Sequence, residues 1–101
     1  MQTLTSKNRL LILCLVVLPL WLGAAEKRIV LIAGKQSHGP GDHEFRAGSL
    51  LLKRCLDQVQ GISTVVHSNG WPADASAFDG AAAVLIYADG GGGHPAIQGE
   101  R

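Results

Sequence analysis

The sequence has little cysteine, and this excludes a fold held together by several disulfide bonds. Its 101 residues include two cysteines, Cys14 and Cys55. Cys14 lies in an N-terminal apolar run that is predicted below to be removed, which leaves Cys55 without a partner inside the chain. Small exported domains usually depend on disulfides or another cross-link for stability. The lack of one is a first indication that residues 26–101 belong to a larger domain.

A surplus of charge of either sign is also lacking. The chain has nine Lys and Arg against eight Asp and Glu, and seven against eight once the first 25 residues are set aside. No basic surface is left that would favour nucleic acid. The Gly-x-Gly-x-x-Gly and Gly-Lys-Ser/Thr patterns of nucleotide-binding loops are missing, as is the Gly-x-Ser-x-Gly pattern of α/β-hydrolases. These absences argue against nucleic acid, nucleotides and a serine nucleophile.

The first 25 residues have the pattern of a secretory signal peptide. Lys7 and Arg9 precede a 13-residue apolar run at 10–22, and the small residues at 23–25 suit a cleavage site. The run is shorter than the roughly 20 apolar residues of a membrane span, and an uncleaved anchor is the alternative. We predict an exported protein, periplasmic or extracellular, that meets the membrane only through this segment during export.

The remainder, 26–101, predicts part of one α/β domain. Continuous apolar runs are typical of strands buried in a parallel sheet. The predicted strands are Arg28–Ala33, Ile62–His67 and Ala81–Ala88. A helix over Phe45–Val59 follows the first strand, because apolar residues recur there at three- and four-residue spacing. Asp42 is its candidate N-cap, and Cys55 lies on the face predicted to be buried.

This order of elements predicts a flavodoxin-like three-layer sandwich with a parallel sheet, of which only the first three strands are present. In such folds the first strand lies between the second and the third, and ligands bind beyond the carboxyl ends of the strands. The loops after the first and third strands then face each other across one crevice. Those loops contain His38, Asp42, His43, Glu44, Asp89, Gly90–Gly93 and His94.

Three chemistries are open for the histidines of this crevice. His38, His43 and His94, together with Glu44, Asp42 or Asp89, are the residue types of a zinc-like divalent metal site, although their spacing matches no tight ligand motif. Acid–base catalysis or substrate hydrogen bonding is the second interpretation. The third is that each histidine is a solvated or capping loop residue.

The glycine run and Trp71 are the remaining candidates for ligand contact. The run Gly90–Gly93 permits a close approach of backbone amides to a ligand, and such amides stabilise an oxyanion, but a flexible surface loop is equally typical of this composition. Trp71 follows the second strand, where it either stacks on a sugar ring or anchors its loop beside Pro72.

Three stretches resemble the trehalose-utilisation (ThuA-like) family of the class I glutamine amidotransferase-like superfamily. They are KRIVLIAGKQSHGPGDHEFRAGSLLLKRCL, VVHSNGWP and FDGAAAVLIYADGGGGHP, which together run from Lys27 to Pro95. The resemblance implies a larger α/β/α domain of which this chain is the N-terminal portion. Related amidotransferases carry a cysteine nucleophile on a later elbow, which would lie beyond Arg101. Members of the ThuA-like family generally lack it, so amidotransferase activity is not carried over.

The family is linked to uptake and breakdown of disaccharides and their keto forms, and its exported members are often fused to other domains. The resemblance therefore implies carbohydrate processing, with a small carbohydrate as partner. The predicted catalytic residues are His38, His43, Asp89 and His94, the predicted substrate contacts are Gly90–Gly93 and Trp71, and the candidate metal ligands are His38, His43, Glu44 and His94. A non-catalytic sugar-binding or interaction module and an inert truncated product are the alternatives.

Overall fold

The computed structural model describes residues 23–97. The predicted signal peptide lies almost wholly outside these residues, so it stays a prediction. Within 23–97, no helix has both the length and the apolar character needed to cross a membrane.

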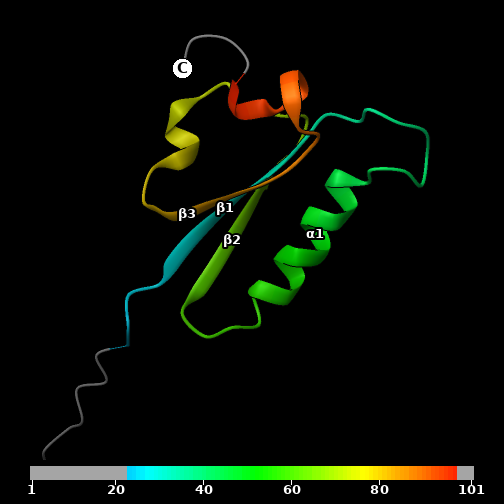
Figure 1. The fold of residues 1–101 in the computed structure, drawn as a ribbon. Helices are drawn as coiled ribbons and strands as arrows, with labels where there is room; N and C mark the ends of the chain where they lie inside the picture. The colour runs from blue at the N-terminus through cyan, green and yellow to red at the C-terminus, as the bar shows by residue number, and fades with distance from the viewer. Residues whose placement is uncertain (1–22, 98–101) are drawn as a thin grey trace, which may run out of the picture.

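The chain alternates strands and helical segments, as the sequence predicts (Figure 1). Each strand contains a run of mainly apolar residues, β-branched ones being most frequent in Ile62–His67, and ends at a polar or glycine-containing loop. The regular elements are β1 (Lys27–Ala33), α1 (Phe45–Leu56), β2 (Ile62–His67) and β3 (Ala81–Tyr87). Three short 3₁₀ turns follow β2 and β3, namely η1 (Ala75–Phe78), η2 (Gly91–Gly93) and η3 (Pro95–Ile97).

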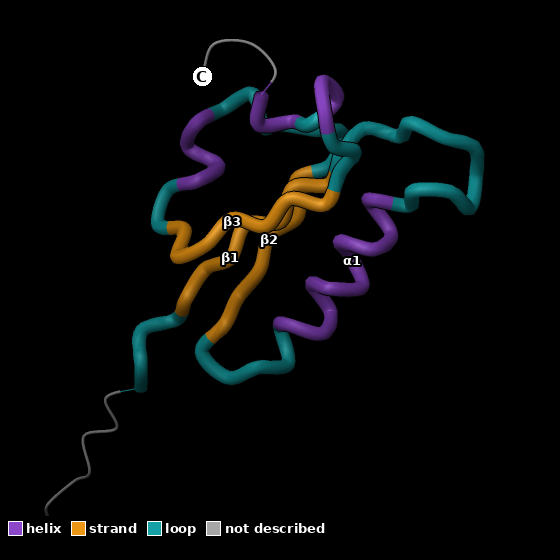
Figure 2. The backbone as a smooth tube through the Cα atoms, viewed as in Figure 1, coloured by secondary structure: helices purple, strands orange, loops and turns teal. Residues whose placement is uncertain are grey.

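The three strands form one parallel sheet in the order β2-β1-β3, which confirms the predicted α/β topology (Figure 2). Helix α1 lies on one side of the sheet and η1 on the other (Figure 1). Two hydrogen bonds hold the η1 segment to β1, from Arg28 Nη1 to the carbonyls of Ala77 (3.1 Å) and Asp79 (2.9 Å). The connections therefore run over opposite faces, as right-handed crossovers in this strand order require.

The core is centred on β1. Its last four residues, Val30 to Ala33, are fully buried, and Phe45 at the start of α1 is buried as well. The prediction that the Ala81–Ala88 strand is buried was wrong, because Val84, Leu85 and Tyr87 are 44%, 38% and 44% exposed. Strand β3 pairs only with β1 among the described residues, so one of its edges lacks a neighbour.

Helix α1 is shorter than predicted and buries a partly different face. It ends at Leu56, and the residue at its N-cap position is Glu44 rather than Asp42, with no side-chain capping bond. Ser49 is buried on its inner face, whereas Cys55 is exposed, so the placement of Cys55 in the core was wrong. Gly48 lets the helix approach β3, since a Cβ there would lie 2.6 Å from Tyr87 Cε1.

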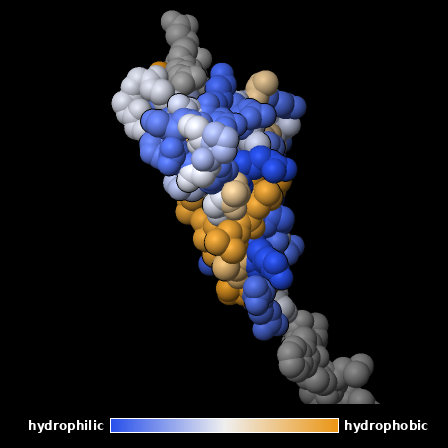
Figure 3. Space-filling view, turned by 90° about the vertical axis from the view of Figure 1, so that its right-hand side faces the viewer, coloured by the Kyte–Doolittle hydropathy of each residue, from blue (hydrophilic) through white to orange (hydrophobic). Residues whose placement is uncertain are grey.

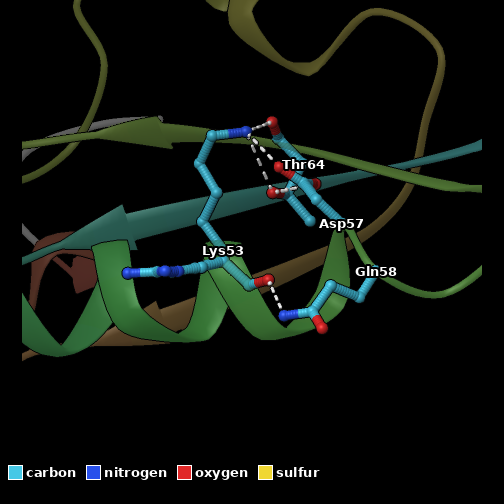
Figure 4. A network of polar contacts seen from close by, with 5 residues as sticks. Lys53, Asp57, Gln58 and Thr64 are labelled. Atoms are coloured by element: carbon cyan, nitrogen blue, oxygen red, sulfur yellow. Dashed lines mark hydrogen bonds and ion pairs between the residues drawn. The ribbon is translucent and has the colours of Figure 1, made fainter.

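A group of polar side chains joins the end of α1 to the middle of β2 (Figure 4). Lys53 Nζ donates to Asp57 Oδ2 (2.6 Å) and to the Thr64 carbonyl (2.7 Å), and the Thr64 hydroxyl donates to Asp57 Oδ1 (2.7 Å). The hydrogen bonds from Lys53 and then Thr64 lower the pKa of Asp57 below its usual value of 3.8, against a smaller opposing effect of desolvation. This contact fixes α1 over the β2 side of the sheet.

The face on the side of α1 has a hydrophilic end and an apolar patch below it (Figure 3). Figure 3 shows hydrophilic residues gathered at the end where the loops lie, and hydrophobic residues over the body below it. The exposed large apolar residues include Leu50 and Leu51 of α1, Val59 in the loop after it, and those of β3.

Candidate functional site at the carboxyl edge of the sheet

The loops that follow β1 and β3 meet at this edge. They leave neighbouring parallel strands, and the Gly34 amide donates to the Tyr87 carbonyl at 2.9 Å, directly beyond the last strand residues. A Cβ at Gly34 would lie 2.7 Å from Ala88 Cβ and 3.0 Å from Ala88 Cα. Real Cβ atoms do not approach that closely, so glycine at this position lets the two loops run side by side.

This approach brings together His38, His43 and Asp89, called here the His–Asp cluster. His43 Nδ1 lies 3.0 Å from Asp89 Oδ1, although the two residues are 46 positions apart in the sequence. Each of the three residues offers a ligand atom, and these atoms lie within 4.8 Å of one another. The convergence of the two loops that the strand order predicts is therefore present.

The His43 side chain is placed by its backbone and by ring packing. Its φ of 48° is in the left-handed region, which few non-glycine residues adopt, and such conformations often occur at functional sites. The His43 ring lies 3.9 Å from the His38 ring and 5.7 Å from that of Phe45, which in turn meets Tyr87 edge-on at 5.1 Å. A continuous series of rings thus connects the exposed histidines to the buried core.

Ser37 joins the second histidine to the carboxylate. Its hydroxyl is 2.8 Å from His38 Nδ1. A hydrogen bond from Ser37 is the main cause that lowers the pKa of Asp89 below 3.8, with desolvation opposing it and the His43 contact adding to it. If the hydroxyl donates to Asp89, its oxygen accepts from His38 Nδ1–H. An ionised carboxylate can only accept, so His43 Nδ1–H donates to Asp89 and leaves Nε2 free of this contact.

Two cavities adjoin the His–Asp cluster. One, of about 210 Å³, is lined by Gly34, Lys35, Gln36, Ser37, Gly70, Ala88, Asp89, Gly93 and Pro95. The other, of about 180 Å³, is lined by Gly34, Gln36, His43, Glu44, Phe45, Arg46, Ala47 and Asn69. Asp89 lines the first and His43 the second, so their contact lies where the two hollows meet.

Two predicted metal ligands are not part of the cluster. Glu44 Oε1 accepts a 2.8 Å hydrogen bond from the Gly41 amide and so braces its own loop. His94 Nδ1 accepts a 3.2 Å hydrogen bond from the Ala96 amide, which makes it a local turn residue. Asp89, predicted as a catalytic residue and as one of the alternative carboxylates for the metal site, lies beside the two histidines instead.

Of the predicted substrate contacts, Gly93 lines a cavity and Trp71 packs within its own region. Gly93 lines the first cavity, whereas a Cβ at Gly90, Gly91 or Gly92 would meet nothing within 4 Å. Gly91, the first residue of the 3₁₀ turn η2, has a φ of 60°, a backbone conformation that favours glycine. The Trp71 ring packs against Phe78 at 5.0 Å and lines neither cavity, in agreement with a loop anchor.

Sequence reasoning missed Ser37, Lys35 and Gln36 as site residues. All three come directly after β1 and Gly34, the position at which side chains leave the carboxyl edge of a parallel sheet. Their position directly after the strand was the signal that could have identified them. The prediction relied instead on the histidines and carboxylates further along the loop.

Comparisons of the chain with protein-family models, with curated proteins and with solved structures found no match. The resemblance to the ThuA-like family accordingly stays a prediction from the quoted stretches.

Proposed function

We propose that the carboxyl-edge crevice binds a small carbohydrate of the disaccharide or keto-sugar class, and that His43 exchanges a proton with it. The observation that carries this proposal is the 3.0 Å contact between His43 Nδ1 and Asp89. A carboxylate on one ring nitrogen orients an imidazole and leaves the other nitrogen for a substrate, which is the arrangement of a base and its orienting group. The His43 side chain is 49% exposed, so a ligand can reach it.

The lining of the larger cavity suits a hydroxyl-rich ligand. Lys35, Gln36 and Ser37 offer hydrogen-bond donors to a carbonyl or hydroxyl oxygen, and Asp89 offers acceptors to a hydroxyl. Ala88 and Pro95 add an apolar surface for the ring carbons. At about 210 Å³ the cavity is below the 300–1,000 Å³ typical of drug-sized ligands, so we expect it to hold one sugar unit of a disaccharide.

Two features of the sequence support the carbohydrate assignment and an extracytoplasmic setting. The loops SHGPGDHEF and DGGGGHP that build the crevice are the stretches that resemble exported ThuA-like proteins. The N-terminal pattern predicts a signal peptide, and a substrate outside the cytoplasm is what a sugar-uptake role requires.

The test is turnover of trehalose and of a keto-disaccharide by the full chain, followed by product analysis. We expect turnover of one of them, with loss of activity in His43→Ala and a large decrease in Asp89→Asn, where an amide replaces the orienting carboxylate. His94→Ala is the matched control, because this histidine bonds its own turn. Binding of a sugar without turnover would contradict catalysis and favour a sugar-binding module. No binding of either sugar would remove the carbohydrate assignment.

A further inference from the structure

We propose that the His–Asp cluster is a binding site for a divalent cation of the zinc class. This inference is independent of the carbohydrate proposal, because the ligands are the chain's own side chains. The sequence alone favoured four residues for a metal, two of which are engaged elsewhere. The structure replaces Glu44 and His94 by Asp89, and gives a set of two imidazoles and one carboxylate.

The spacing of the ligand atoms suits such an ion. Zinc bonds of about 2.0–2.2 Å in a tetrahedron place neighbouring ligand atoms roughly 3.3 Å apart. His43 Nδ1 and Asp89 Oδ1 are already 3.0 Å apart, and all three ligand atoms lie within 4.8 Å. Because His38 and His43 are exposed loop residues, small side-chain rotations are enough to close the remaining gap.

The chemistry of the ligands selects the class of ion. Imidazole nitrogen suits zinc and neighbouring transition metals, whereas calcium and magnesium prefer oxygen ligands alone. Three protein ligands leave a fourth coordination position, and that composition is typical of catalytic rather than structural zinc. The first cavity begins at Asp89, so we infer that the fourth position faces a bound ligand.

Ser37 acts in this site as a positioning residue. Its hydroxyl engages His38 Nδ1, so His38 offers Nε2 to the ion. Partners of this kind fix the tautomer and orientation of ligating histidines, and removing one typically lowers metal affinity about 10–100-fold.

Occupation of the site changes the role of His43. In the metal-free chain its Nδ1 lies 3.0 Å from Asp89 Oδ1 and donates to that carboxylate. A cation bound through Nδ1 requires the neutral ring to carry its proton on Nε2 instead, so the ring becomes a donor toward the cavity. A bound ion of this class also supplies Lewis acidity that polarises a carbonyl oxygen.

The experiment is titration of the metal-free full chain with Co²⁺ and Zn²⁺, without any sugar. Tetrahedral Co²⁺ is followed by its visible absorption and Zn²⁺ by calorimetry. We expect one equivalent to bind, and at least tenfold weaker binding in His38→Ala, His43→Ala and Asp89→Ala. Ser37→Ala is expected to weaken binding to a smaller extent. His94→Ala, which removes the same side chain from a neighbouring turn, keeps the affinity of the parent.

Histidine NMR of the unmodified chain makes the test independent of whether variants fold. We expect Zn²⁺ to shift the imidazole signals of His38 and His43 and to move the His43 proton from Nδ1 to Nε2, with His67 and His94 unaffected. No binding, or signals that shift at His67 and His94 instead, would overturn the site. Zinc binding without sugar turnover would support the metal site and count only against the proposed function.

Discussion

The tripeptide Val-Leu-Ile occurs in β1 at 30–32 and again in β3 at 84–86, and the sheet pairs the two copies residue by residue. Val30 and Leu31 are completely buried, whereas their partners Val84 and Leu85 are 44% and 38% exposed. All three side chains therefore lie in the core in β1, whereas in β3 Val84 and Leu85 are exposed and Ile86 is half-buried. Their burial is decided by the number of neighbouring elements and not by the strands' own sequence.

The difference arises from position in the sheet. Strand β1 has a strand on each side, α1 on one face and the η1 segment on the other. Among the described residues β3 pairs with β1 alone, and α1 approaches it at Tyr87. Strand β2 is also an edge strand of the described sheet. It differs from β3 because the end of α1 is joined to it by the hydrogen bonds among Lys53, Asp57 and Thr64. Four substitutions test this account.

The largest expected effect is that of Leu31→Ala. Removing a fully buried leucine leaves a cavity, and we expect the free energy of unfolding to fall by about 2–5 kcal/mol. Urea unfolding followed by circular dichroism measures it. A loss as small as that of a surface substitution would show that β1 is not the core.

Gly34→Ala tests the point where the two strands' loops converge. The new methyl group would lie 2.7 Å from Ala88 Cβ, and overpacking of this kind typically costs about 1–3 kcal/mol. We also expect the His43–Asp89 contact to be disturbed, which the histidine NMR signals would report. Gly90→Ala is the matched control, since its Cβ meets nothing within 4 Å and its φ is −84°. Equal effects of the two substitutions would contradict the close approach.

Leu85→Ala is the matched partner of Leu31→Ala, because the two leucines are paired in register. With 38% of Leu85 exposed, less area is withdrawn from water and the surroundings leave less of a cavity. We expect a loss of about 1 kcal/mol, against 1.5–3 kcal/mol for complete burial of such a side chain. Urea unfolding of both variants under the same conditions gives the two losses in the free energy of unfolding. Equal losses would show that β3 is as well covered as β1.

The smallest expected effect is that of Asp57→Asn on the pH dependence of stability, through the contact between α1 and β2. The pKa of Asp57 is lowered in the folded chain by Lys53 and Thr64, so the unfolded chain binds its proton first as pH falls. The contribution is complete above the unfolded value of 3.8 and is lost as pH falls through the folded pKa. We expect Asp57→Asn to flatten the decline of stability between about pH 5 and pH 2. Parallel pH curves for the two chains would exclude the contribution of Asp57.

The sequence predicted the elements well because their signals are local. The strand at Ile62–His67 has the predicted bounds, and the order β2-β1-β3 follows from helices between parallel strands. Burial was harder to predict, because Val84 and Val30 lie in identical tripeptides and differ only in their neighbours. Cys55 and Ser49 show the same limit. Helical spacing predicts an apolar face of α1, but which residues of that face are buried depends on how the helix lies on the sheet, and Ser49 is buried whereas Cys55 is exposed.

The candidate site was predicted at the level of loops and less well at the level of atoms. Strand order alone places His43 and Asp89 at one edge, and they do touch. Whether a loop carboxylate faces inward depends on local hydrogen bonds, and Glu44 is held by the Gly41 amide in its own loop. The left-handed φ of His43, the close approach at Gly34 and the contacts of Ser37 are likewise properties of the folded loops that residue spacing does not encode.

The 46 positions between His43 and Asp89 give their contact a further consequence. A cation or sugar that binds both residues closes a long chain segment and acts as a reversible cross-link between the loops of β1 and β3. The unfolded chain lacks this arrangement, so occupancy adds RT ln(1 + [L]/Kd) to stability, about 2.7 kcal/mol at a hundredfold excess over Kd. The melting temperature of the chain is therefore itself a ligand assay that requires no knowledge of the reaction.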